Sequence, residues 1–332
     1  MEILAGKGSL PPGWADAVVG VPRELFLPEV IEVQDQLVSR SDSPERWLAA
    51  VYDDLALTTQ VNDGRDVPDG AYRLPTSSSS MPSVMLETVD VDPVLVAEAA
   101  QNLGSAGFSP RVVRGDGERG WPAGSPFDRV IATYTVAEIP YAWVEQAPTG
   151  RIVAPWGGSF FSHSFAVLEI ADGEAHGRFS GYPAFMRTRS GRPHRGYLSD
   201  FLQHTNDDTP SRSDLSPLAI TGDADAQFFI GLEVPDAWHL LVEAEDGSGE
   251  ATLWLLADDR RSWAAAEYVP GAGEYAIGQY GPRRLWEEVE RAYRLWADRG
   301  SPPRDRAGLT VTRNGSLVWL DSPDNALTSS RG

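Results

Sequence analysis

The sequence predicts an α/β fold in which a parallel, doubly wound sheet is followed by a mixed α+β region. Short apolar strands alternate with helical segments over residues 88–156, a pattern typical of a parallel sheet with helices on both faces. After Gly157 the pattern changes to two-residue alternation with hairpin turns. A chain of 332 residues is long enough for two domains, so we predict domains at 1–157 and 158–332.

Four strands define the first of these domains. Asp92 is expected to cap a helix between the first two strands, because Pro93 follows it at the first helical position, and Gly104 is expected to end that helix. Upstream, we expect helices at 12–20 and 44–52, a polar connection at 32–43 and a loop at 62–72. The strands are expected at residues 88–91 (TVDV), 111–113 (RVV), 127–133 (FDRVIAT) and 151–156 (RIVAPW).

The second region is expected to combine hairpins with one amphipathic helix. Asp172-Gly173 and Asn314-Gly315 are hairpin-turn signals between alternating segments. The helix at 283–300 carries Trp286, Tyr293 and Trp296 on one side, and such an aromatic face needs a partner surface. Further strands are expected at 252–257 and 263–268, and a polar, mobile segment at 191–216.

Composition excludes several classes of function. A formal net charge of −20 disfavours nucleic acid and anionic membranes as partners. There is no cysteine, and the five histidines do not occur at metal-binding spacing, so we expect no metal. No apolar run reaches the roughly 18 residues of a membrane span, and the start lacks signal-peptide features, so we expect a cytoplasmic location. Serine-hydrolase, P-loop and GxGxxG motifs are also absent.

A run of small hydroxyl side chains is the strongest candidate for a binding site. It is followed by PSVMLE, which we interpret as a short helix begun by a proline. Hydroxyls at a helix start can hold a carboxylate, whereas the alternative is a flexible serine-rich linker. The run consists of Thr76, Ser77, Ser78, Ser79 and Ser80.

Two acids after strands could bind a nucleoside. Asp90, at the end of the first strand, could receive the two ribose hydroxyls, and the alternative is a solvated strand-end acid. Asp116 lies between Gly115 and Gly117 after the second strand. Glycines allow close approach of a ligand, so Asp116 could accept from an adenine amino group, with an ordinary turn as the alternative.

Several motifs in this order resemble the protein-L-isoaspartate O-methyltransferase family. They are VPRELFLP, PTSSSSMPSVMLE, TVDVDP, VVRGDGERGWP, PFDRVIAT and GRIVAPWG, and the resemblance covers roughly residues 12–157. GPRRLWEEVERAY, GLTVT and VWLDSPD resemble the C-terminal extension of actinobacterial homologues that act in the maturation of ribosomal peptides, the graspetides and lanthipeptides.

The resemblance implies a Rossmann-like, S-adenosylmethionine-dependent O-methyltransferase that releases S-adenosylhomocysteine. Its substrate would be an aspartate or isoaspartate of a modified ribosomal precursor peptide, and the ester would lead to an aspartimide or isoaspartate. A general isoaspartate repair enzyme and a catalytically inactive peptide-binding relative remain the alternatives. The region 158–332 would form a wall of the peptide site.

The resemblance also implies residue roles. Ser78 matches the serine of the catalytic loop, with Thr76 and Ser79 beside it. Asp90 matches the ribose-binding acid, and Asp116 the adenine-side acid, flanked by Gly115 and Gly117. Ser77, Ser80 and Thr133 would line the substrate site.

One departure from the family is large. The family has a strand, a glycine-rich cofactor loop and a helix, about 30 residues in all, where Glu87 here abuts Thr88. A helix ending at Glu87 and a strand beginning at Thr88 would leave no connecting residues. We therefore expect either a break between these residues or a rearranged sheet, and we favour the break.

Overall fold

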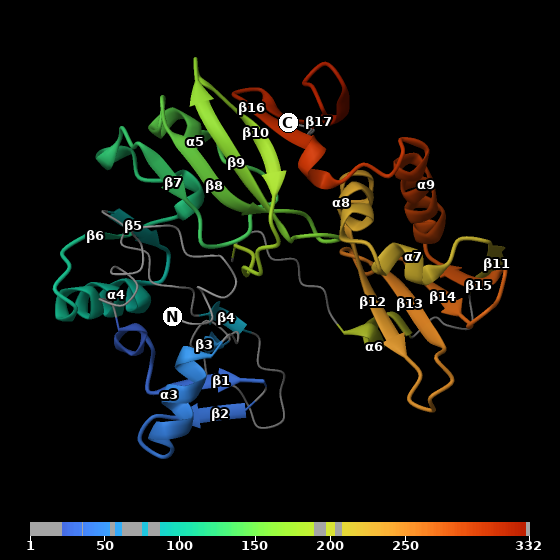
Figure 1. The fold of residues 1–332 in the computed structure, drawn as a ribbon, viewed down its shortest axis with the longest axis horizontal. Coiled ribbons are helices and arrows are strands. Elements are labelled where there is room, and N and C mark those ends of the chain that lie inside the picture. The colour runs from blue at the N-terminus through green and yellow to red at the C-terminus, as the bar shows by residue number, and fades with distance from the viewer. Residues whose placement is uncertain are drawn as a thin grey trace. The chain divides into compact units, whose positions relative to one another are not determined.

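The computed structural model describes residues 22–34, 36–53, 57–61, 75–78, 87–188, 197–202 and 208–329. The chain forms two compact units, residues 1–123 and 124–332, which are coloured along the chain in Figure 1. This boundary lies before the third expected strand rather than at 157/158, and the functional division at 157/158 stays a prediction. Within the described residues, no helix is both long and apolar enough to span a membrane.

The first unit contains a four-stranded sheet, ordered β2-β1-β3-β4, that the sequence did not predict. The expected polar connection at 32–43 is wrong, because β1 and β2 form an antiparallel hairpin there and bury Ile31 and Val38. The helix expected at 44–52 is confirmed as α3, which buries Trp47 and Val51 against these strands. The expected helix at 12–20 and loop at 62–72 lie outside the described residues. The elements are η1 (Arg23–Phe26), β1 (Val30–Val33), β2 (Gln36–Ser39), α3 (Pro44–Tyr52), β3 (Thr58–Val61) and β4 (Pro75–Ser78).

The first unit also contains the first two expected parallel strands. β5 (Glu87–Asp90) pairs in parallel with β6 (Arg111–Arg114), and α4 (Pro93–Ser105) connects them. Two short 3-10 turns follow, η3 (Gly117–Arg119) and η4 (Pro122–Gly124), the second ending at the unit boundary. Asp92 caps α4 as expected, accepting hydrogen bonds from the N–H groups of Val94 and Leu95. None of the residues of α4 is fully buried.

The expected break between Glu87 and Thr88 is wrong. Both residues belong to β5, where they pair in succession with Arg111 and Val112. A rearranged sheet, our second expectation, stays a prediction, because β5 and β6 belong to the first unit and the next parallel strands to the second. In the described residues β5 and β6 form a two-stranded sheet of their own, whereas the next parallel strands belong to a different sheet. The α/β class is thus confirmed, but its parallel strands are divided between two sheets.

The second unit is built on a seven-stranded sheet ordered β18-β17-β16-β10-β9-β8-β7. β7 and β8 are parallel, and every other neighbouring pair is antiparallel. Both expected hairpins are present, and the strand expected at 127–133 is shorter than predicted. Trp143 of α5 packs in the same core as Ile152 of the sheet. The elements are β7 (Arg129–Ile131), α5 (Tyr141–Gln146), β8 (Arg151–Trp156), β9 (Ser164–Ala171), β10 (Glu174–Ser180), η6 (Arg304–Arg306), β16 (Ala307–Thr312), β17 (Gly315–Leu320) and β18 (Ala326–Ser329).

A five-stranded antiparallel sheet, ordered β11-β15-β14-β13-β12, completes the second unit. The segment 191–216 contains α6 and β11, so it is not simply the mobile connection that we expected. The strands expected at 252–257 and 263–268 are confirmed as β13 and β14. The elements are α6 (Leu198–Phe201), β11 (Thr209–Ser213), α7 (Pro217–Thr221), α8 (Ala224–Glu233), β12 (Ala237–Glu243), β13 (Ala251–Ala257), β14 (Trp263–Tyr268), β15 (Tyr275–Tyr280) and α9 (Leu285–Asp298).

Two helices, α8 and α9, pack against both sheets of the second unit. Phe228 of α8 packs in the core of the seven-stranded sheet, and Ile230 of the same helix packs in the core of the five-stranded sheet. In α9, Trp286 and Trp296 are buried, so the partner surface expected for the aromatic face exists. α8 is apolar on more than one side, as expected of a helix between layers, whereas α9 packs through a single apolar face.

Candidate functional site

The carboxyl ends of β5 and β6 bring the expected nucleoside-binding residues together. In the parallel register Asp90 pairs with Arg114, and the next residue, Gly115, donates its N–H to the Asp90 carbonyl oxygen over 2.9 Å. A Cβ atom at Gly115 would lie 3.2 Å from Cγ1 of Val89, tighter than ordinary contact. Glycine thus keeps this turn close to β5, so that Asp116 and Gly117 follow directly beside the end of the strand.

Asp90 and Asp92 have different local roles. Asp90 is half-buried, and its Oδ1 accepts the backbone N–H of Asp92 over 2.8 Å. The Asp92 carboxylate uses Oδ1 for the N-terminus of α4 and Oδ2 for the side-chain amide of Gln60, at 3.2 Å. Since Asp92 is occupied by structural bonds, Asp90 is the better ribose ligand, a role that stays a prediction.

Asp116 has a local structural role as well. Its side chain caps η3, accepting the N–H of Glu118 over 3.0 Å, and it lies 3.7 Å from the guanidinium of Arg119. The side chain is 49% exposed. The turn interpretation is therefore present in the structure, and an adenine contact would have to use the exposed part of the same carboxylate.

The hydroxyl run begins in a strand instead of at a helix start. Thr76, Ser77 and Ser78 belong to β4, which pairs antiparallel with β3. The sequence did not predict this strand, and the helix end expected at Glu87 is wrong because Glu87 belongs to β5. Ser79 and Ser80, together with most of the expected PSVMLE helix, lie outside the described residues.

Gln60 links β4, which carries the hydroxyl residues, to the carboxyl end of β5, the candidate nucleoside site. The sequence did not reveal this role of Gln60. Ser77 pairs with Gln60 across β3 and β4, and the Gln60 amide reaches Asp92. A chain of contacts within the first unit thus runs from β4 through Gln60 to the carboxyl end of β5. The only signal in the sequence was the β-prone segment TTQV.

Thr133 lies in the second unit, just after β7, where it is exposed. Two residues further on, Thr135 is held by a segment that comes after β10, and Val136 is held by β8. Thr135 accepts and donates backbone hydrogen bonds with Thr188 and Met186, at 3.1 and 2.7 Å, and Val136 donates to the carbonyl of Pro155. The chain beyond residue 180 therefore shapes the carboxyl ends of β7 and β8.

Arg187 is a second residue that the sequence did not reveal. Its guanidinium donates to Ser159 Oγ over 3.1 Å and to the carbonyl oxygen of Gly157 over 3.4 Å. The Ser159 hydroxyl in turn donates to the carboxylate of Asp258. The cluster joins the end of β8 to the five-stranded sheet, so its evident role is to hold the second unit together.

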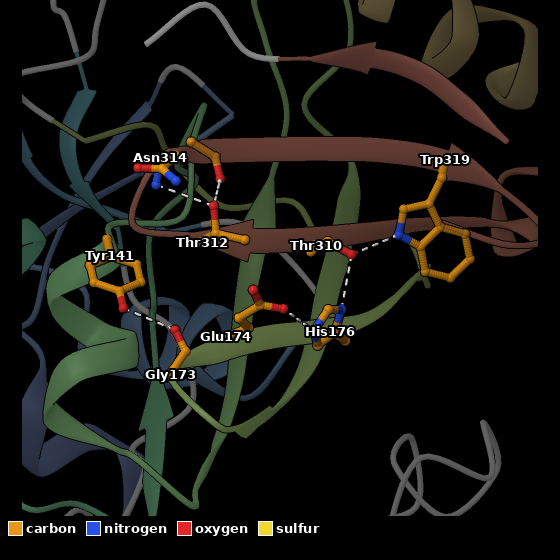
Figure 2. Close-up of polar contacts among 9 residues, drawn as sticks. Tyr141, Gly173, Glu174, His176, Thr310, Thr312, Asn314 and Trp319 are labelled. Atoms are coloured by element: carbon orange, nitrogen blue, oxygen red, sulfur yellow. Dashed lines mark hydrogen bonds and ion pairs between the residues drawn. The ribbon is translucent and has the colours of Figure 1, made fainter. Parts of the chain in front are cut away.

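The hydrogen-bond network around His176, drawn in Figure 2, has a structural role. Trp319 donates its indole N–H to Thr310 Oγ1 over 3.1 Å, and that hydroxyl lies 2.9 Å from Nδ1 of His176. Nε2 of His176 lies 3.0 Å from the Glu174 carboxylate. Because Thr310 already accepts from the indole, its hydroxyl can donate to Nδ1, which leaves the ring proton on Nε2 facing Glu174. In the described part of the chain, no cluster of three metal-ligating side chains occurs.

The comparisons with known proteins agree with the resemblance seen in the sequence. Residues 77–180 match the family model described as protein-L-isoaspartate(D-aspartate) O-methyltransferase. The chain is 36% identical over 94 residues to the protein-L-isoaspartate O-methyltransferase of Hyperthermus butylicus, a match covering 27% of this chain and 39% of that one. It is 28% identical over 186 residues to the enzyme of that name from Methanopyrus kandleri, covering 52% and 81% of the two chains.

These matches support the family for the segment they cover. A solved structure named protein-L-isoaspartate O-methyltransferase aligns with 96% of this chain and 98% of its own, at 18% identity and a TM-score of 0.48, a likeness from which no functional argument follows. The family model ends at residue 180, so most of the second unit lies outside it. The chain spans only 39% of the length of the Hyperthermus relative, and the activity of the whole protein is therefore a proposal.

Proposed function

We propose that this protein is an S-adenosylmethionine-dependent O-methyltransferase that esterifies the carboxyl group of an isoaspartyl or aspartyl residue in a protein or peptide. The observation that carries the proposal is the family match over residues 77–180. That segment includes β5 and β6, whose carboxyl ends bring Asp90 next to Gly115. Ligands of open α/β sheets bind outside the carboxyl ends of parallel strands, which is where these residues lie.

The residues present fit the nucleoside part of the cofactor. Asp90 offers a half-buried carboxylate to the ribose hydroxyls, and the glycine at 115 keeps the neighbouring turn close to the strand. The glycine-rich loop expected for the methionine part has no counterpart in the sequence between Glu87 and Thr88. S-adenosylmethionine, when bound, supplies a methyl group attached to a sulfonium centre.

The reaction requires little acid–base catalysis by the protein. An aspartate carboxylate has an ordinary pKa of about 3.9 and is ionised at neutral pH, so no general base is needed. A carboxylate oxygen forms the new bond to the methyl carbon while the carbon–sulfur bond breaks, giving the methyl ester and S-adenosylhomocysteine. The task of the protein is to place the two reactants in line, and placement alone can supply several kcal/mol, up to about 7–11. We assign one contact of that placement to the hydroxyl of Ser78, with the rest shared by the other residues around the two reactants.

For the substrate, we propose a modified, ribosomally made peptide whose aspartate becomes a methyl ester and then an aspartimide. Methoxide leaves more readily than oxide, so the next backbone nitrogen can close the imide ring. The support is the long region after residue 180, which builds its own five-stranded sheet outside the matched family segment. Repair of isoaspartyl residues in damaged proteins is equally consistent with the family match.

A catalytically inactive relative is the remaining alternative, and one observation favours it. The block of about 30 residues that carries the glycine-rich cofactor loop in the family has no counterpart between Glu87 and Thr88. If the cofactor cannot bind, the chain would only recognise the peptide.

The experiment is transfer of a labelled methyl group from S-adenosylmethionine to three acceptors: an isoaspartyl peptide, the matching aspartyl peptide and a cyclised precursor peptide. Preferred labelling of the cyclised precursor supports the biosynthetic role, whereas preferred labelling of the isoaspartyl peptide supports repair. A base-labile label is expected, because methyl esters hydrolyse in alkali. The absence of labelling in all three, together with no cofactor binding, would favour the inactive relative.

A further inference from the structure

The two edge strands of the five-stranded sheet differ in how well they are protected against pairing with other chains. β11, at one edge, is five residues long and carries Pro210 and Arg212. Proline and charged side chains on an edge strand prevent pairing with other chains. β12, at the other edge, is seven residues long with the sequence AWHLLVE, and it has no proline, lysine or arginine. Within the described residues, it pairs with β13 alone (Figure 1).

The backbone of β12 presents hydrogen-bonding groups at this edge. The ladder with β13 is bracketed by the bonds Asp258 N–H to Asp236 O and Ala244 N–H to Glu250 O. In an antiparallel ladder, bonded residues alternate along the strand, so the even-numbered residues of β12 face β13. Leu241 and Glu243 therefore direct their N–H and C=O groups away from β13, toward the outer edge.

An apolar surface lies next to that edge. Leu240 and Val242 are 38% and 42% exposed, and Leu240 pairs across the ladder with the half-buried Trp254. The neighbouring row of the same face is covered, because Phe201 of α6 packs there against Trp238. We call Leu240, Val242 and Trp254 the apolar shelf.

The negative charges at the end of β12 and after it determine which kind of peptide this edge would bind. Glu243 ends the strand, and Glu245, Asp246 and Glu250 follow in the connection to β13; all four residues are exposed. An extended segment placed along β12 would lie close to these carboxylates. Electrostatic complementarity favours a segment with lysine or arginine and opposes an acidic one.

We propose that the outer edge of β12 binds an extended, basic peptide segment as an additional strand, with alternate apolar side chains on the apolar shelf. This is recognition by strand addition, in which backbone bonds give affinity and alternate side chains give specificity. If the proposed function holds, the segment belongs to the polypeptide substrate and lies apart from the methylated residue. A second copy of this chain is the competing occupant.

The test uses the full-length protein without cofactor, so that its outcome does not depend on methyl transfer. The probe is a fluorescein-labelled peptide of about eight residues with alternating lysine and valine, and its anisotropy reports binding. Two matched peptides serve as controls, one with glutamate in place of lysine and one with N-methylated backbone on its pairing edge. We expect the basic peptide to bind at least about tenfold more tightly than either control.

Matched variants locate the site. Leu240 and Leu295 are both 38% exposed, the first on β12 and the second on α9. Leu240→Lys should weaken binding of the basic peptide at least about tenfold, whereas Leu295→Lys should leave it unchanged. The peptide should also slow amide hydrogen exchange at Leu241 and Glu243.

Three results would overturn the proposal. They are no binding of the basic peptide, equal binding of the N-methylated peptide, or equal loss in the two lysine variants. Self-association of the free protein that is abolished by Leu240→Lys would show that a second copy occupies the edge. Failure of methyl transfer with intact peptide binding would reject the proposed function and leave this inference standing.

Discussion

The two parallel strand pairs of the molecule are packed very differently. In the pair β5–β6, Val89, Asp90 and the residues of β6 are half-buried or exposed, and the connecting helix α4 has no fully buried residue. The pair β7–β8 continues into five antiparallel strands, and Ile152 and Leu168 in that sheet are fully buried. The same type of pairing thus occurs once in a two-stranded sheet and once at the edge of a seven-stranded sheet, where β7 is half-buried or exposed and β8 carries the buried side chains.

This difference in packing suggests that folding stability comes mainly from the second unit, whereas the candidate ligand-binding residues lie in the first. Large buried apolar areas in the second unit supply most of the driving force for folding. The candidate cofactor residues Asp90, Gly115 and Asp116 lie at the ends of β5 and β6, beside a helix, α4, that has no fully buried residue. Regions that bind ligands are often drawn from the less stable parts of a fold, and a ligand bound there should order them.

Substitution of one leucine in each unit tests this contrast most strongly. Leu168 in β9 is fully buried, whereas Leu95 in α4 is half-buried. Leu168→Ala should lower the free energy of unfolding by about 2–5 kcal/mol, because it leaves a cavity in a packed core. Leu95→Ala should cost less than half as much. Urea denaturation of both variants measures the difference, and equal losses would refute the contrast.

Ser78→Ala should affect activity and leave stability nearly unchanged. Loss of one hydroxyl hydrogen bond, about 0.5–1.5 kcal/mol, should slow methyl transfer about two- to tenfold. Single-turnover transfer rates and urea midpoints, measured together, check this expectation. An unchanged rate would remove Ser78 from the site, and a large loss of stability would make its role structural.

Asp92→Ala should weaken the first unit through its helix cap. Asp92 accepts two backbone N–H groups at the start of α4, and loss of such a cap costs about 0.5–2 kcal/mol. Amide exchange should accelerate in the first turn of α4 and stay unchanged in the seven-stranded sheet. Asp92→Asn is the control, because asparagine also caps helices, and equal effects of both variants would contradict the capping role.

The smallest effect is expected at the surface of the second unit. A hydrogen bond from Arg306 lowers the pKa of Asp321 below its ordinary value of 3.8. The stabilisation is therefore present above that ordinary pKa and is lost as the pH falls through the lowered pKa. Asp321→Asn should flatten the acid limb of stability against pH slightly. An identical acid limb in both proteins would show that the pair contributes nothing.

Local signals in the sequence predicted some elements well. Proline and aromatic spacing identified α3, and the bounds of β8 were predicted from an apolar run followed by glycines. The cap of α4 at Asp92 was predicted from the proline that follows it. These predictions needed only neighbouring residues.

Long-range pairing could not be predicted in the same way. The β1–β2 hairpin turns at Gln34, which has a φ of 49° and carries no strong turn signal. The contact between Gln60 and Asp92 joins residues 32 positions apart, and no local pattern specifies it. The strand β12 was missed because its sequence AWHLLVE does not alternate cleanly between polar and apolar residues.

The most direct test of the account is equilibrium binding of S-adenosylmethionine, measured by calorimetry together with amide hydrogen exchange, on the wild-type protein and on Asp90→Ala. We predict binding by the wild type, slower exchange across β5, α4 and β6, and at least about tenfold weaker binding by the variant. No binding by the wild type, or protection confined to residues 124–332, would contradict the central claim that the carboxyl ends of β5 and β6 hold the cofactor.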